Sequence, residues 1–129
     1  MTASPHDALF KSAFSLPEHA RAELESLLPA ALVARIDWST LTLVPGSFID
    51  EALTERESDL LFEARTGGGG RVRLYLLFEH QSTVDVLMAF RMLRYEVRIW
   101  ERDLVADPGA RTLVPVVPVV LQNADTGEV

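Results

Sequence analysis

The stretch from Ser58 to Glu79, which reads SDLLFEARTGGGGRVRLYLLFE, decides the fold. Two mostly apolar runs flank four consecutive glycines, and this arrangement is typical of two strands joined in a β-hairpin. The glycines could also serve as a flexible linker, but four residues between two strands favour a turn. Because the run from Leu74 to Phe78 is apolar on both faces, it indicates a strand buried in the centre of a sheet.

The register of this hairpin predicts which acidic side chains meet. A three-residue loop over Gly68 to Gly70 places Asp59 directly opposite Glu79, with Cβ atoms about 4.5–5.5 Å apart. Two carboxylates at this distance repel each other, and a divalent cation such as Mg²⁺, which binds one or two carboxylates plus water and phosphate oxygens, would compensate. On spacing alone, a solvated sheet edge is the better explanation of two acids, since ionised residues are mostly exposed. The apolar run before Glu79 favours a paired or coordinated site, since burying an isolated charge is costly.

Two polar residues extend the second strand of the hairpin. Gln81 lies two residues beyond Glu79, so it projects to the same face if the strand continues that far. His80 lies between them and should point to the opposite face. We interpret it as a core or supporting residue in preference to a catalytic base.

The rest of the chain divides into helical and extended segments. We expect helices over 8–14 and 17–28, with Pro17 in a first turn, and a strand over 40–44. A long helix should follow Gln81 and end at 107–109, and 113–121 should form a last strand in which two prolines are awkward. The long helix carries a continuous apolar face at spacings of three and four residues: Val86, Phe90, Leu93, Val97, Trp100 and Leu104. The order α-β-β-β-α-β predicts one α/β domain over 1–129, with a mixed central sheet flanked by helices.

Composition excludes several classes of protein. The 129 residues contain no cysteine, so a disulfide framework, a zinc ribbon and a cysteine nucleophile are ruled out. The sequence has neither a long apolar run nor a secretory signal, so we expect a cytoplasmic protein with no membrane association.

Charge is distributed unevenly along the chain. Twelve basic and nineteen acidic residues give a net charge of −7, which argues against a generic nucleic-acid coat. Residues 71–102, however, carry six arginines against four acids. Arg91, Arg94, Arg98 and Arg102 form a stripe on the long helix. Its first three members are candidates for contacts to DNA phosphates, and a solvated helix face is an equally good interpretation.

Several motifs together resemble one family, the Rpn-type recombination-promoting nucleases, which are also described as transposase-like. The resemblance covers about His6 to Val120. It rests on five segments of the sequence: His6 to Lys11, Leu28 to Ile49, Ser58 to Leu61, Phe78 to Ser82, and Met88 to Tyr95.

This family belongs to the PD-(D/E)XK nuclease superfamily, so the resemblance implies a restriction-endonuclease-like αβββαβ core and a metal-dependent DNA endonuclease. By that analogy Asp59 and Glu79 would bind Mg²⁺, with Mn²⁺ as the alternative. Gln81 would take the place that the wider superfamily usually gives to lysine. Superfamily members often use an additional acid near the first helix; Asp7 is a candidate there, and a helix cap explains it equally well.

The resemblance also carries expectations about partners and about alternatives. It implies DNA as substrate, a link to recombination or transposition, and leaves a homo-oligomer open. Family members usually continue past the last core strand, so we expect this chain to lack a C-terminal extension. The alternative function is a weak or inactive remnant of the nuclease fold that acts as a protein-interaction module; a third is a small acidic binding protein.

Overall fold

The computed structural model describes residues 5–14, 16–45, 53, 57–80 and 85–122, and its elements follow the predicted order. The helices are α1 (Pro5–Phe14), α2 (Pro17–Leu27), α3 (Ala30–Val33) and α4 (Met88–Ala106). The strands are β1 (Ile36–Leu43), β2 (Glu57–Thr66), β3 (Arg71–Glu79) and β4 (Val116–Gln122). None of the helices in these ranges is long and apolar enough to cross a membrane.

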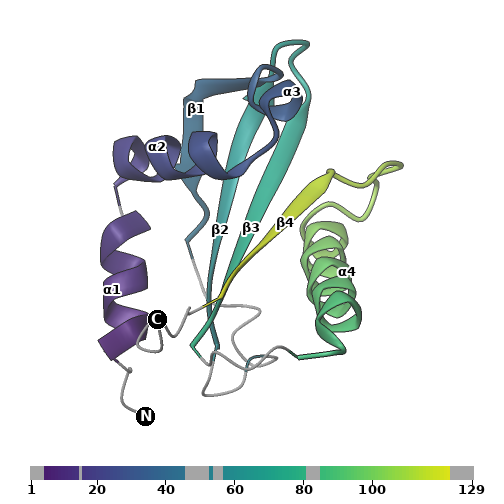
Figure 1. The fold of residues 1–129 in the computed structure, drawn as a ribbon. Coiled ribbons are helices and arrows are strands. Elements are labelled where there is room, and N and C mark those ends of the chain that lie inside the picture. Colours follow the sequence, from purple (N-terminus) through teal and green to yellow (C-terminus); the bar gives the residue numbers. More distant parts are fainter. Residues whose placement is uncertain (1–4, 15, 46–52, 54–56, 81–84, 123–129) are drawn as a thin grey trace.

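The four strands form one mixed sheet in the order β1-β2-β3-β4 (Figure 1). The first three strands pair antiparallel, and β4 pairs parallel to β3 because α4 carries the chain back along the sheet. Pro118 is tolerated in β4 because this strand lies at the sheet edge, where a missing backbone N–H costs little. The predicted α/β class with a mixed sheet flanked by helices is therefore confirmed.

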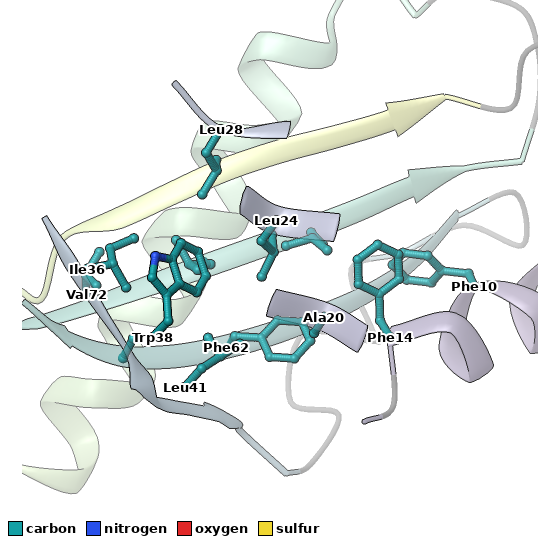
Figure 2. Close-up of a cluster of buried hydrophobic side chains, with 13 residues drawn as sticks. Phe10, Phe14, Ala20, Leu24, Leu28, Ile36, Trp38, Leu41, Phe62 and Val72 are labelled. Carbon is teal, nitrogen blue, oxygen red and sulfur yellow. The ribbon is translucent and has the colours of Figure 1, made fainter. Parts of the chain in front are cut away.

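Helices cover both faces of the sheet. On one face, α1 and α2 bury Phe10, Phe14, Ala20 and Leu24 against apolar side chains of the strands, as Figure 2 shows. The spacing of four residues within each pair places both side chains on one side of its helix. On the other face, α4 packs over the sheet (Figure 1). The two faces thus have separate cores, and the second one adjoins the acidic ends of β2 and β3.

The hairpin is present, but its expected register is wrong by two residues. Glu57, not Asp59, lies opposite Glu79, and Arg65 lies opposite Arg71. The loop does contain three residues, but it begins one residue earlier, at Gly67. The Thr66 N–H donates to the Gly70 carbonyl at 2.9 Å, and the Gly70 N–H donates to the Thr66 hydroxyl at 3.1 Å. Gly69 has a φ of 90°, which only glycine adopts at little cost, so backbone geometry fixes this loop.

The face of α4 that packs on the sheet also differs from the prediction. The buried side chains are Met92, Tyr95 and Ile99, which contact Tyr75 and Leu77 of β3. Most of the residues predicted to form the apolar packing face are exposed instead: Val86, Phe90, Leu93, Val97 and Leu104. The reason is electrostatic. The sheet face beneath α4 carries buried carboxylates, and α4 turns hydrogen-bonding groups toward them rather than its most apolar side.

We expect the two sides of α4 to contribute very differently to stability. Ile99→Ala removes a fully buried side chain and should lower the free energy of unfolding by about 2–4 kcal/mol. Leu93→Ala truncates a side chain that is more than half exposed and should lower it by less than about 1 kcal/mol. Urea denaturation measures the loss of unfolding free energy in both variants. Equal losses would contradict the observed orientation of α4.

Ion pairs link the far ends of β2, β3 and α4. Glu63 of β2 accepts hydrogen bonds from Arg71 at 3.0 Å and Arg73 at 3.1 Å, and Arg73 also contacts the Asp103 carboxylate at 2.9 Å. The guanidinium of Arg71 lowers the pKa of Glu63, although partial burial opposes the shift. Arg73 is buried, so these two carboxylates supply the counter-charges that it needs.

The lowered pKa of Glu63 makes one contribution to stability dependent on pH. Because the folded-state pKa is depressed, this contribution is present above the ordinary carboxyl range, near pH 4, and is lost as pH falls further. Arg71→Gln should therefore reduce stability by up to about 1 kcal/mol at pH 7. Denaturation curves from pH 7 down to pH 3 should show this difference shrinking, whereas exposed Arg35→Gln should show no such trend. A difference that stays constant with pH would contradict the pairing.

Candidate active site

Three acidic side chains lie on one face of the sheet, at the adjacent ends of β2 and β3. Glu57 pairs directly with Glu79, while Asp59 pairs with Leu77 and is a diagonal neighbour of Glu79. All three are buried, with exposed fractions of 7% for Glu57, 8% for Asp59 and 5% for Glu79. We call Glu57, Asp59 and Glu79 the acid cluster. Asp59 and Glu79 thus share a face, as expected, although they are not directly opposite.

Glu57 was missed by the sequence reasoning, although a signal for it exists. It precedes Asp59 by two residues in the same strand, so strand alternation places both on one face. Moving the hairpin loop by one residue would have brought Glu57 opposite Glu79. The omission therefore follows from the wrong register.

Hydrogen bonds from two tyrosines hold the acid cluster in place. The Tyr75 hydroxyl donates to Asp59 Oδ2 at 2.9 Å, and the Tyr95 hydroxyl donates to Glu57 Oε1 at 3.2 Å. Both tyrosine side chains are buried, and their rings meet edge to face at a centroid distance of 6.0 Å. This packing fixes the ring positions, so the hydroxyls are oriented toward the carboxylates before any ligand binds.

Arg91 of α4 supplies positive charge to the acid cluster. Its guanidinium pairs with Glu57 and with Asp85, and lies 3.9 Å from Glu79 Oε2. The carboxylate of Asp85 also accepts the Leu87 N–H at 2.8 Å, which anchors the segment just before α4. At neutral pH the acid cluster, Asp85 and Arg91 together carry a formal charge of −3. Such an excess of negative charge favours the binding of a further cation.

The other predicted site residues either lie away from the acid cluster or fall outside the described residues. Gln81 lies outside the described residues. Asp7 lies within the first turn of α1 rather than before it, so it is not the N-cap that we considered, and its side chain is also outside the described part. Arg94 and Arg98 are exposed on α4, beside Leu93 and Val97. Of the predicted arginines, Arg91 is the one that contacts the acid cluster.

A second polar contact lies directly behind the acid cluster, on the opposite sheet face. Ser58 Oγ and His80 Nε2 are 2.6 Å apart, and the His80 ring stacks on Phe78 at a centroid distance of 5.0 Å. His80 therefore occupies the face that the sequence predicted. Because Ser58 adjoins Asp59 and His80 adjoins Glu79, this contact ties together the two strand ends that bear the acids.

The donor chemistry of the acid cluster suits a hard divalent cation. Carboxylate oxygens are the ligands that Mg²⁺ and Mn²⁺ prefer, and Mg²⁺ typically takes only one or two carboxylates with water completing its shell. Within the described ranges, no three His, Asp or Glu side chains are grouped in the geometry of a ready-made metal site. Asp59 and Glu79 offer two carboxylates on one face of the sheet, the number that Mg²⁺ typically takes.

Comparison with known proteins adds the family context. Residues 4–126 match the family model described as "Putative transposase, YhgA-like". The chain is 44% identical over 122 residues to the recombination-promoting nuclease RpnA of Escherichia coli K12, and 40% identical over 122 residues to RpnD of E. coli O157:H7. It is also 38% identical over 125 residues to RpnE of E. coli K12, which is named an inactive recombination-promoting nuclease-like protein.

These alignments cover 95–97% of this chain. They cover 41% of RpnA, 46% of RpnD and 41% of RpnE, so the chain spans less than half the length of these relatives. No solved structure matches the chain.

We expect the pairing of Arg91 with the acid cluster to be essential for folding. Arg91→Met removes the guanidinium that pairs with buried Glu57 and should lower the free energy of unfolding by about 3–5 kcal/mol. Adding Glu57→Gln to this variant removes the uncompensated charge and should restore a large part of the loss. Arg94→Met, at an exposed position on the same helix, should cost less than about 0.5 kcal/mol. Chemical denaturation that finds Arg91→Met as stable as Arg94→Met would overturn this interpretation.

Proposed function

Because the chain belongs to the YhgA-like transposase family, we propose that it is a metal-dependent DNA endonuclease that hydrolyses phosphodiester bonds in recombination or transposition. Two of its relatives, RpnA and RpnD, are named recombination-promoting nucleases. The observation that carries the proposal is the burial of Asp59 and Glu79 on one face, at the adjacent ends of the two central strands. Acids are rarely buried together unless they are paired or bind a cation.

In this proposal Asp59 and Glu79 hold Mg²⁺, with Mn²⁺ as the alternative. A bound metal would polarise the scissile phosphate and lower the pKa of a water molecule. Gln81 would donate a hydrogen bond to orient water or phosphate, but as a neutral amide it adds no charge. The hydrogen bond from Tyr75 fixes one oxygen of Asp59.

In this proposal Arg91 takes the electrostatic role that a lysine usually plays in the wider PD-(D/E)XK superfamily. The sequence holds a single lysine, Lys11, which is exposed on α1. Arg91 already contacts the acid cluster, and its planar guanidinium is well suited to phosphate oxygens. We therefore assign a DNA phosphate contact beside the reacting bond to Arg91, whereas DNA contacts by Arg94 and Arg98 stay a prediction.

Nicking of supercoiled plasmid DNA in Mg²⁺ tests this proposal. Asp59→Asn and Glu79→Gln should each reduce the cleavage rate by at least about 100-fold, because each removes a charged metal ligand. Exposed Glu18→Gln serves as the matched control and should cleave like the wild type. Circular dichroism verifies that each variant is folded. Undiminished cleavage by either site variant would remove the assignment of that residue.

The second candidate function is an inactive form of the fold that acts as a protein-interaction module. It is favoured by the similarity to RpnE, and by the ion pair through which Arg91 already neutralises part of the acid cluster. Calorimetric titration with Mn²⁺ separates the two candidates. A binding signal that is lost in Asp59→Asn supports the nuclease, whereas a folded wild-type chain that neither binds Mn²⁺ nor cleaves DNA supports the interaction module.

A further inference from the structure

A row of apolar side chains runs along the side of α4 that faces away from the sheet. Phe90 and Leu93 are 56% and 54% exposed, and Val97 and Leu104 are each 40% exposed. Trp100 completes the row and is half-buried. We call these five residues the apolar stripe. Exposed apolar side chains that are contiguous along an element mark interaction surfaces, whereas isolated ones do not.

The apolar stripe has the spacing of a coiled-coil seam. Its members follow one another at intervals of three, four, three and four residues, which is the a/d pattern of a heptad repeat. Among the described residues, α4 packs on the sheet through Met92, Tyr95 and Ile99, which lie on its other side. The helix therefore has a second face suited to packing against another helix.

We propose that two copies of this chain associate through the apolar stripe, with their α4 helices antiparallel. Leu93 then packs against the partner's Leu104, and Val97 packs against the partner's Trp100. The two-fold axis repeats each contact, so one stripe provides both sides of the interface. The Trp100 indole N–H donates to the Val114 carbonyl at 2.8 Å, which holds this ring in place before association.

The charges beside the apolar stripe specify the antiparallel arrangement. Arg94, Arg98 and Glu101 line one edge and share an open hollow with Leu93 and Val97. In the antiparallel pairing, the partner's Glu101 lies beside the helix turn between Arg94 and Arg98. The two-fold axis repeats this contact, so opposite charges meet at two places. A parallel pairing would instead bring Glu101 against the partner's Glu96, and like charges at these flanking positions are unfavourable.

The second edge of the stripe adds little repulsion to this arrangement. It carries Glu96 and Asp103, which approach their counterparts on the partner. Arg73 already pairs with Asp103 at 2.9 Å and compensates its charge. The edge with Arg94, Arg98 and Glu101 therefore determines the antiparallel orientation.

A second copy accounts for the stripe better than DNA does. Phosphate contacts require positive charge but gain nothing from a row of leucine, valine and phenylalanine side chains. The stripe from Phe90 to Leu104 is about 21 Å long at 1.5 Å per residue, and one helix face of this length is smaller than a standard interface. We therefore expect a weak dimer, with a Kd on the order of micromolar.

Sedimentation of the whole chain across a concentration series measures this association. The wild type should shift from monomer to dimer, and Leu93→Glu should remain monomeric. Arg94→Glu and Glu101→Arg alone should each raise the Kd by at least about tenfold, since each creates two like-charge contacts. The double variant Arg94→Glu/Glu101→Arg should regain the wild-type Kd. Arg35→Glu, at an exposed position outside α4, is the charge-reversal control and should dimerise normally.

The double variant makes the test specific. Failure of the double reversal to restore dimerisation would overturn the antiparallel pairing, and a wild type that stays monomeric at all concentrations would overturn the proposal. All four substituted side chains are exposed, so circular dichroism should show an unchanged fold. The outcome does not depend on nuclease activity, because the acid cluster lies on the opposite side of α4.

Discussion

The burial of Glu57, Asp59 and Glu79 is the constraint on which the rest of the site depends. A carboxylate that leaves water must find hydrogen bonds or opposite charge, and three of them at adjacent strand ends multiply this requirement. The protein meets it with groups from two other places, the Tyr75 hydroxyl within the sheet and Tyr95 with Arg91 on α4. Tyr95 and Arg91 reach the acid cluster only when α4 lies in its observed position.

This constraint explains why α4 presents the less apolar of its two sides to the sheet. Burying the stripe of Phe90, Leu93 and Val97 would remove more apolar surface from water. It would also turn Arg91 and Tyr95 away from the acid cluster, so the buried carboxylates would lose these two partners. The cost of an uncompensated buried carboxylate exceeds what a few additional buried methylene groups contribute. The electrostatic requirement therefore decides the rotation of the helix, and the apolar stripe is left available for another molecule.

The same arrangement relates the structure to the proposed chemistry. The acid cluster lies where the central strands end, and Ser58 and His80 tie those ends together from behind. Positions at strand ends are held rigidly by the sheet yet remain close to the surface, which suits a site that must orient a large substrate. The chain is similar both to a relative named a nuclease and to a relative named inactive.

The sequence by itself determined the element order, the mixed sheet and the pair Asp59 and Glu79 on one face. Alternation along strands and the apolar run before Glu79 are local properties, so they can be recognised without a structure. Only the tertiary structure decided the register and the orientation of α4. The register depends on which glycine adopts a positive φ, and shifting that loop by one residue exchanges Asp59 for Glu57 opposite Glu79. The orientation of α4 depends on buried charges contributed by distant strands, which the periodicity of the helix sequence cannot encode.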